Sequence, residues 1–457
     1  MGKIKLSKTI ARKIFILVLF GCLMGCSSNL YVKPSPSVVP ATEIVEITLQ
    51  PDQPNSLPNT PTPYPTLPPN NTPTVEVTST VVREQEPTIG EGVSICSDNG
   101  KPKPLPDGFG FNGTIVYQES INEGIYTIGG KPIRRGQLPI EQGLDYFVFG
   151  FSPDNEWLAY WPTSFIPGTD QPILDTAKVQ LLSAKGALKE QTLDLSTIKK
   201  EFGSKYRLLG FGLPSYWIND HLIFTTIYFQ PDNDRIPSRL SSMSKIFDPF
   251  EGQWHDEILS GLPGWTEHSA VSFSPDLKRV FYEGAGFVLL NWDMLTPLWI
   301  DGEPIADDAF AAWAPDSSYV AYIKNVPSML DQQFSILSSN GKRQRLIHQY
   351  SSLKFYIWDF RWSPNSQYIA FSGKITDGDV RLFVYDVLNN RYTYNCILHG
   401  YEENPPSIVW SPDSSLIALS GWDEPLQLFD LQTGEIFSLL SNVSAVGWSD
   451  SFPVTLP

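Results

Sequence analysis

Residues 362–371 read Trp362-Ser-Pro-Asn-Ser-Gln-Tyr-Ile-Ala-Phe371, and this short pattern occurs four more times along the chain. The other copies are Phe151-Ser-Pro-Asp-Asn-Glu-Trp-Leu-Ala-Tyr160, Phe273-Ser-Pro-Asp-Leu-Lys-Arg-Val-Phe-Tyr282, Trp313-Ala-Pro-Asp-Ser-Ser-Tyr-Val-Ala-Tyr322 and Trp410-Ser-Pro-Asp-Ser-Ser-Leu-Ile-Ala-Leu419. Proline presets φ for the first central position of a type I turn, and Asp or Asn tolerates the next position. Because an aromatic residue precedes this turn and an apolar run follows it, the pattern predicts a recurring β-hairpin.

Two degenerate copies extend the series. Trp217-Ile-Asn-Asp-His-Leu-Ile-Phe224 lies where a copy is missing, and Trp448-Ser-Asp450 lies near the end of the sequence. The aromatic positions are 38 to 66 residues apart, which suits one four-stranded sheet plus insertions. Each hairpin is also followed by a third strand-like run, as at residues 380–386 and 426–430. The sequence therefore predicts a repeat architecture built from small antiparallel sheets.

The tandem pattern resembles the TolB-like repeats of the WD-repeat-like β-propeller class, in which such a hairpin forms the two inner strands of each blade. The glycine that usually follows Asp in those repeats is replaced here by Asn155, Leu277, Ser317, Ser366 and Ser414. We expect this difference to weaken the turn and to leave the strand register unchanged. The resemblance implies protein–protein interaction in a complex of the cell envelope.

The two ends of the repeat region complement one another. Residues 113–117, 124–128 and 132–134 predict three strands without an innermost partner, and residues 443–448 predict an inner strand without the other three. Joining them closes a ring and removes exposed sheet edges. We therefore expect an all-β fold, a seven-bladed β-propeller with four-stranded antiparallel blades, preceded by a disordered stalk. Six or eight blades are the alternatives, because the third blade is poorly marked and residues 452–456 can add a strand.

The first 25 residues have the features of a lipoprotein signal peptide. A basic segment up to Lys13 precedes an apolar run at 14–25, which is shorter than the roughly 20 residues needed to span a bilayer. The run ends in Leu23-Met24-Gly25-Cys26, which looks like a bacterial lipobox with Cys26 as the lipidated residue. Cys22 is a less suitable site, because bulky Leu23 follows it. We expect a lipid-anchored, extracytoplasmic protein at the cell surface or in a periplasm; an ordinary secretory signal or a buried helix is the alternative.

Residues 26–95 predict a linker between this lipid anchor and the propeller at 96–457. Thirteen of the 39 prolines of the chain lie between residues 31 and 90. Such a segment cannot bury enough apolar surface to offset the entropy of ordering it, and proline favours an extended polyproline-like chain. A proline motif that docks a protein is the weaker alternative. We interpret the segment as an extended stalk.

Charge and cysteine content narrow the choice of partners. The formal net charge is −16, and an acidic surface repels nucleic acid and anionic lipid headgroups. We therefore expect no nucleic-acid partner, and membrane attachment through the acyl chains only. Besides the lipidated residue, the mature chain would retain Cys96 and Cys396, which either form a disulfide in an oxidising compartment or remain two unrelated thiols.

Motifs of known catalytic chemistry are missing from the sequence. The five histidines are not paired at metal-ligand spacing, and there is no His-Glu-x-x-His, Cys-x-x-Cys or Gly-x-Ser-x-Gly. The aspartates of the repeat, Asp154, Asp276, Asp316 and Asp413, are expected to form turns rather than to bind calcium or act in catalysis. We therefore expect no catalytic residue, no metal and no cofactor, and a binding module rather than an enzyme.

Aromatic residues beside carboxylates occur in the loops expected on the opposite rim. The candidate ligand-binding residues are Trp161, Phe165, Phe229, Trp265, Asp308, Tyr401, Glu402, Trp422 and Asp423. This combination suits a protein or peptide, especially a cationic one, and it also suits a glycan stacked on tryptophan. Alternatively, Trp161, Trp265 and Trp422 only cover blade edges. We expect a protein- or peptide-binding scaffold; a carbohydrate-binding or glycan-processing propeller and a structural lipoprotein without a ligand are the alternatives. The ligand and the oligomeric state do not follow from the sequence.

Overall fold

The computed structural model describes a β-rich unit within Ser79–Pro457, and its first 78 residues fall in a separate unit. The described residues are 82–84, 94–119, 124–140, 145–163, 178–193, 206–217, 223–231, 241–255, 271–283, 287–292, 296–301, 310–326, 331–350, 355–375, 378–401, 405–421 and 424–454. They contain 31 strands and one short 3-10 helix, η1 (Ser97–Gly100). Within these ranges no helix has the length and apolar character needed to cross a bilayer. The expected signal peptide, Cys26 and most of the expected stalk lie outside the described residues.

The described strands form seven sheets, named I to VII here in chain order. Sheet I contains β31 (Ser444–Ser449), β4 (Phe111–Gln118), β5 (Ile125–Gly130) and β6 (Arg134–Gln137); sheet II contains β7 (Asp145–Phe151), β8 (Trp157–Thr163), β9 (Lys178–Ser183) and β10 (Leu188–Thr192); sheet III contains β11 (Tyr206–Trp217), β12 (Ile223–Pro231), β13 (Ser241–Asp248) and β14 (Gln253–Trp254). Sheet IV contains β15 (Val271–Phe273), β16 (Arg279–Glu283), β17 (Phe287–Asn291) and β18 (Thr296–Asp301).

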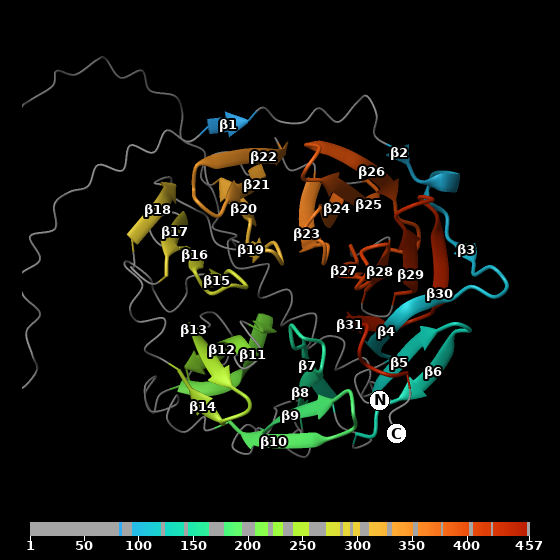
Figure 1. Ribbon diagram of the computed structural model, residues 1–457, viewed down its shortest axis with the longest axis horizontal. Helices are drawn as coiled ribbons and strands as arrows, with labels where there is room; N and C mark the ends of the chain where they lie inside the picture. Colours follow the sequence, from blue (N-terminus) through green and yellow to red (C-terminus); the bar gives the residue numbers. More distant parts are fainter. Residues whose placement is uncertain are drawn as a thin grey trace, which may run out of the picture. The chain divides into compact units, whose positions relative to one another are not determined.

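The remaining three sheets have five strands each. Sheet V contains β19 (Phe310–Trp313), β20 (Tyr319–Val326), β21 (Asp331–Ser338), β22 (Arg343–Tyr350) and β1 (Val82–Glu84); sheet VI contains β23 (Phe355–Trp362), β24 (Tyr368–Ile375), β25 (Val380–Asp386), β26 (Arg391–Ile397) and β2 (Ser94–Ile95); sheet VII contains β27 (Ser407–Trp410), β28 (Leu416–Ser420), β29 (Leu426–Asp430), β30 (Ile436–Leu440) and β3 (Lys103–Pro104). In every sheet the strand that ends in the repeat aromatic lies on the inner side (Figure 1). The fold is all-β and of the propeller type.

The repeated hairpin adopts the predicted turn in each complete copy. In sheet VI the buried Ser363 hydroxyl accepts a hydrogen bond from Tyr368 N at 2.9 Å and donates to the side chain of Asn365 at 2.7 Å. The residue after Asp or Asn has positive φ in all five copies: Asn155, Leu277, Ser317, Ser366 and Ser414, with φ between 56° and 62°. This is the left-handed region that glycine adopts most easily. A positive φ is the physical reason to expect that replacing glycine at this position weakens the turn.

Serine at this position also links neighbouring sheets. Ser317 Oγ accepts a hydrogen bond from Asp276 N at 3.1 Å, Ser366 Oγ accepts one from Asp316 N at 3.0 Å, and Ser414 Oγ accepts one from Asn365 N at 3.1 Å. Each bond joins the turn of one sheet to the turn of the next. Glycine would fit the backbone conformation, but it has no oxygen to accept this bond. The replacement of glycine thus connects sheets IV to VII in series.

Substitution of Ser366 separates these two effects. Ser366→Ala removes the acceptor of Asp316 N and keeps the unfavourable φ, so we expect the free energy of unfolding to fall by about 1 kcal/mol. Ser366→Gly loses the same hydrogen bond, but it removes the cost of a side chain at positive φ, which is roughly 1–2 kcal/mol. Urea denaturation should therefore rank the wild type and the glycine variant above the alanine variant. A glycine variant less stable than the alanine variant would contradict this account.

The repeat tryptophans form a second set of links between sheets. Trp313 Nε1 donates to Ser272 O at 2.9 Å, Trp362 Nε1 donates to Ala312 O at 2.9 Å, and Trp410 Nε1 donates to Arg361 O at 3.1 Å. Each accepting carbonyl belongs to the residue just before the repeat aromatic of the preceding sheet. Trp217 makes the same contact with Gly150 O at 3.2 Å. These indoles are buried, and each polar group has a partner, as buried donors require.

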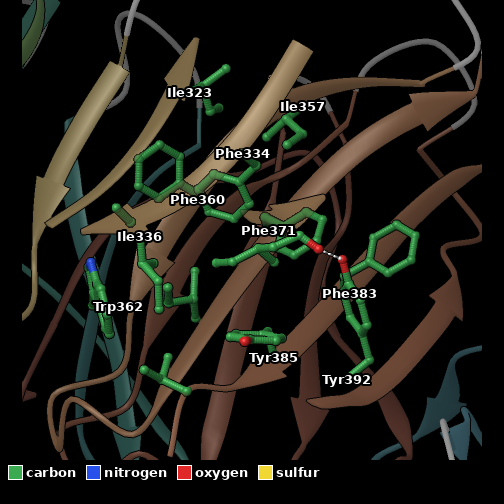
Figure 2. Packing of buried hydrophobic residues seen from close by; sticks show 14 of the residues in the cluster. Ile323, Phe334, Ile336, Ile357, Phe360, Trp362, Phe371, Phe383, Tyr385 and Tyr392 are labelled. Carbon is green, nitrogen blue, oxygen red and sulfur yellow. Dashed lines mark hydrogen bonds between the residues drawn. The ribbon is translucent and has the colours of Figure 1, made fainter. Parts of the chain in front are cut away.

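Seven clusters of buried apolar side chains fill the spaces between consecutive sheets. Representative pairs, from I–II round to VII–I, are Val116 with Leu158, Ala159 with Ile223, Ile246 with Val280, Leu289 with Val320, Ile336 with Ile369, Leu382 with Ile417, and Leu428 with Ile115. Figure 2 shows the cluster between sheets V and VI, where the rings of Phe334 and Phe360 lie 5.0 Å apart and those of Phe371 and Phe383 stack at 4.9 Å. The last cluster joins sheet VII to sheet I.

The C-terminal strand pairs with the first long strand of the chain. β31 is antiparallel to β4, with Trp448 opposite Ile115 and Ser449 opposite Thr114. The Trp448 ring packs edge-on against Phe111 at 5.0 Å. This is the pairing that the two ends of the repeat region predicted. Residues 452–454, considered as a further strand, are not a strand in the described part of the chain, although Phe452 is buried between sheets I and II.

Three short strands between Val82 and Pro104, together called the strap here, lie at the outer edges of sheets V, VI and VII. Its short strands β1, β2 and β3 are parallel to β22, β26 and β30 respectively. Cys96 forms a disulfide with Cys396 in β26, which is one of the two alternatives that the sequence left open. Gly100 has φ of +76°, and a Cβ there would lie 1.8 Å from Ile397 O. Strands β1 and β2 lie within residues expected to belong to the linker, so the folded unit begins before residue 96.

Candidate functional site

Tyr401 links the connection from sheet VI to sheet VII (β26–β27) to the β28–β29 connection of sheet VII, and the sequence analysis singled out residues in both. Its side chain is fully buried, and its hydroxyl lies 2.7 Å from Leu419 O and 2.6 Å from Pro425 O. These carbonyls belong to the two sides of the β28–β29 connection. Burial, together with the charge of Glu424, raises the pKa of Tyr401 well above its usual value. The phenol therefore stays protonated and keeps donating to this connection.

The residues around Tyr401 form the base of both loops. A Cβ on Gly421 would lie 2.9 Å from Glu424 Cγ, and a Cβ on Gly400 would lie 3.1 Å from Pro425 Cγ. Gln427 Nε2 donates to His399 O at 2.8 Å. The β26–β27 connection and the β28–β29 connection therefore start from one packed base. Residues 402–404 and 422–423, which continue from it, lie outside the described residues.

The structure places two of the expected ligand-binding residues in the core. Trp161 is 3% exposed and packs in the cluster between sheets II and III, and Tyr401 is 0% exposed. The expectation that these two side chains present themselves to a ligand is wrong, because both are needed to fill space between strands and loops. For Trp161, packing at a blade edge was the stated alternative.

The other expected ligand-binding residues fall into two groups. Phe229, expected in a loop, lies in strand β12 and pairs with Leu208 on one side and Ser241 on the other. The loop that follows it starts after Pro231. Phe165, Trp265, Asp308, Glu402, Trp422 and Asp423 lie outside the described residues. Of the original set, Glu402, Trp422 and Asp423 thus belong to the two loops that Tyr401 joins.

The aspartates of the repeat serve the turns. Asp413 accepts hydrogen bonds from Ser411 Oγ and Ser415 Oγ, both at 2.7 Å, and from Ser415 N at 3.1 Å. Burial alone would raise the pKa of Asp413, but these hydrogen bonds from Ser415 and Ser411 hold it below its usual value. Across the described ranges, no group of three or more His, Cys, Asp or Glu side chains is placed to hold a metal ion.

Sequence reasoning missed the role of Gly400, Gly421 and Gln427 as the base of the loops. The dipeptide Gly400-Tyr401 just before Glu402 and Glu403 is a usable signal, because glycine beside a large aromatic permits a close approach of backbone. The sequence does not say which other loop the tyrosine reaches. That pairing depends on contacts between residues 18 and 24 positions apart.

The chain matches no protein-family model and no curated protein. It is similar in structure to the periplasmic gluconolactonase of Pseudomonas aeruginosa, with 14% identity over 75% of this chain and 99% of that chain and a TM-score of 0.46. An oligogalacturonate lyase in complex with manganese has 12% identity over 75% and 86% of the two chains and a TM-score of 0.44. The dihydro-heme d1 dehydrogenase NirN has 13% identity over 77% of both chains and a TM-score of 0.43. These likenesses concern the fold alone.

They nevertheless correct one expectation from the sequence, that the chain is not an enzyme. A lyase, a gluconolactonase and a dehydrogenase are found among the structures similar to this chain. Catalytic side chains of such folds come from loops of different sheets, so they leave no contiguous motif in the sequence. The missing catalytic motifs therefore do not exclude enzymatic activity.

Proposed function

We propose that this protein is a lipid-anchored, extracytoplasmic β-propeller that binds or processes a carbohydrate at the loops joined by Tyr401. The observation that carries the proposal is the buried Tyr401 hydroxyl, which lies between Leu419 O and Pro425 O and fixes the two loops on one base. Loops on a rigid scaffold are where binding and catalytic residues of such folds gather. The proposal has three parts, namely the propeller, the anchor and the ligand.

The first part is that sheets I to VII are the seven blades of a closed propeller related to the TolB-like repeats. Two observations support closure. The β31–β4 pairing joins the two ends of the repeat region in one sheet, and the cluster containing Leu428 and Ile115 joins sheet VII to sheet I. A closed arrangement leaves no sheet face without a neighbour, which suits the burial of apolar residues on both faces of the central strands.

The second part is the anchor at Cys26 and an extracytoplasmic location. The disulfide between Cys96 and Cys396 supports an oxidising compartment, because such bonds rarely persist among cytosolic thiols. The sequence Leu23-Met24-Gly25-Cys26 supports lipidation. Metabolic labelling with a radioactive fatty acid is expected to label the full-length chain and not its Cys26→Ala variant. Label retained by the variant and lost by Cys22→Ala would move the anchor to Cys22.

The third part is the carbohydrate ligand. Trp422 is flanked by Asp423 and Glu424, and the other loop contributes Glu402 and Glu403. An indole offers a flat apolar surface to the ring face of a sugar, and carboxylates accept hydrogen bonds from its hydroxyls. Two such carboxylates at suitable separation are also the groups that hydrolyse glycosidic bonds. The combination of one tryptophan with several acids therefore fits a glycan better than an apolar ligand.

Replacement of Trp422 tests this proposal. Full-length protein purified in detergent is screened against an array of glycans, and Trp422→Ala is expected to weaken glycan capture by about tenfold or more, since loss of a central aromatic anchor costs roughly 2 kcal/mol or more. The midpoint of thermal unfolding should stay unchanged. Leu388→Ala is the matched control, because Leu388 is 73% exposed on the β25–β26 turn, and it should bind like the wild type. Capture of cationic peptides instead of glycans, abolished by the same variant, would favour a peptide-binding scaffold and reject the carbohydrate.

A further inference from the structure

Arg361 is an exception at a repeated position of the fold. It lies on β23, the inner strand of sheet VI, directly before the repeat aromatic Trp362. The corresponding residues before the other repeat aromatics are Gly150, Tyr216, Ser272, Ala312, Val409 and Gly447. Arg361 is thus the one charged residue in this set of seven. Its side chain is 55% exposed, although the neighbours on either side, Phe360 and Trp362, are buried.

Two hydrogen bonds near Arg361 join β23 of sheet VI to β27 of sheet VII. Trp410 Nε1 donates to the Arg361 carbonyl at 3.1 Å. Asp359 Oδ2 accepts a hydrogen bond from Ile408 N at 2.9 Å. Both contacts come from β27, the inner strand of the next sheet, which lies beside β23 in Figure 1. The position is therefore fixed by two strands rather than by one loop.

Asp359 also forms an ion pair with the arginine side chain. Its Oδ1 lies 3.2 Å from Arg361 Nε, and the Asp359 side chain is only 13% exposed. Within the described part of the chain, neither terminal nitrogen of Arg361 has a hydrogen-bond partner. The ion pair uses Nε and leaves the two terminal nitrogens without a partner in that part of the chain. This is the arrangement in which a guanidinium is ready to donate two parallel hydrogen bonds.

Stability alone does not explain this arrangement. An exposed ion pair contributes only about 0–1 kcal/mol, and the small residues at the equivalent positions show that the fold accepts glycine, serine or alanine there. The chain carries a formal net charge of −16. The exposed guanidinium of Arg361 therefore has the opposite sign to the net charge of the protein. The exposed terminal nitrogens of a guanidinium match the oxygens of a carboxylate or phosphate.

We propose that Arg361 and Asp359 form a binding site for a carboxylate, separate from the loops of sheet VII. The planar guanidinium matches a carboxylate through two hydrogen bonds. A carboxylate carries one negative charge, so it meets less repulsion from Asp359 and from the acidic chain than a phosphate dianion would. Asp359 supplies the orientation and Arg361 supplies the contact with the ligand. The ligand class is a small organic acid or an acidic sugar that reaches the inner strands.

The test uses full-length protein in detergent and three probes at constant ionic strength: glucuronate, glucose and inorganic phosphate. Glucuronate and glucose share a sugar ring and differ in the carboxylate. Calorimetric titration is expected to show binding of glucuronate and at least tenfold weaker binding of glucose and of phosphate, since one bidentate charged contact contributes about 1.5–3 kcal/mol.

Two variants of Arg361 complete the test. Arg361→Gln is expected to abolish the preference for glucuronate, and Arg361→Lys is expected to retain part of it, because lysine keeps the charge and loses the fork. Trp422→Ala, directed at the proposed carbohydrate site, should leave the preference intact. Equal binding of glucuronate and glucose by the wild type, or an unchanged preference in Arg361→Gln, would overturn the proposal. Phosphate binding as tight as glucuronate binding would overturn its restriction to carboxylates.

Discussion

Deletion of residues 444–457 is expected to leave a chain that no longer unfolds cooperatively. The deletion removes β31, so the inner edge of β4 loses its partner. It also removes Trp448 from the cluster between sheets VII and I, and Phe452 from the cluster between sheets I and II. Loss of one buried aromatic side chain costs roughly 3–5 kcal/mol. Because a domain is stable by only about 5–15 kcal/mol in total, two such losses together with a strand exceed what the fold tolerates.

Thermal unfolding followed by circular dichroism, together with limited proteolysis, measures this effect. A single substitution, Trp448→Ala, provides an intermediate case and should lower the free energy of unfolding by about 3–5 kcal/mol. The control is Leu388→Ala, which removes an exposed side chain from a turn and should change stability by less than about 0.5 kcal/mol. A truncated chain with the melting temperature of the full protein would show that the β31–β4 pairing is not what holds sheets VII and I together.

Loss of the disulfide is expected to produce the second largest effect. Cys96 and Cys396 are 300 residues apart in sequence, and a cross-link that closes a loop of this length restricts the unfolded chain strongly. Removal of a native disulfide typically costs 2–5 kcal/mol. The double variant Cys96→Ala with Cys396→Ala should therefore unfold at a clearly lower urea concentration. Alanine is preferred to serine because both sulfur positions are buried, 4% and 0% exposed, and a buried hydroxyl would add its own cost.

Comparison with the reduced wild type separates the cross-link from the packing of the sulfur atoms. Wild-type protein unfolded in the presence of a thiol reductant should lose stability by nearly the same amount as the double variant. A further change, Lys103→Ala, breaks the 2.8 Å ion pair with Glu435 where the strap crosses sheet VII. Since both groups are about one third exposed, it should cost no more than about 1 kcal/mol. Equal stability of the oxidised wild type and the double variant would mean that the strap is held by its backbone pairing alone.

The hairpins and the pairing of the chain ends could be predicted because their determinants are local and repeated. Proline, Asp or Asn, and an aromatic residue at fixed spacing define one turn, and five copies remove the ambiguity of a single motif. The joining of residues 443–448 to residues 113–117 followed from counting strands, and the structure pairs β31 with β4. Strong local signals therefore predicted the hairpins and the pairing of β31 with β4.

The strap was not predicted, because its strands are only two or three residues long. Val82–Glu84 and Ser94–Ile95 have no periodic pattern that would distinguish them from linker. They become strands because β22 and β26 offer free backbone groups at the outer edges of sheets V and VI. The sequence does not show that these sheet edges can pair with residues 82–84 and 94–95. Composition alone therefore assigns the residues up to 95 to the stalk.

The candidate site was predicted only in part for a related reason. An aromatic residue in a loop has the same sequence signature whether it packs inward or faces a ligand. Tyr401 and Trp161 pack inward, because each fills a space between elements that are distant in sequence. Arg361 was overlooked because a single charge within a strand carries no motif. Its exposure between two buried neighbours and its ion pair with Asp359 are visible only in the structure.

The strap determines how a pulling force on the N-terminal side would enter the protein. Tension on the chain ahead of Val82 acts first on the three paired residues of β1, which can detach without disturbing any other strand. The tension then reaches β2 and Cys96, where a covalent bond passes it to β26, the strand next to the outer edge of sheet VI. Strand β4, the first long strand of the chain, carries none of this load. Tension that detaches β1 and β2 would thus leave the four antiparallel strands of sheets V and VI paired.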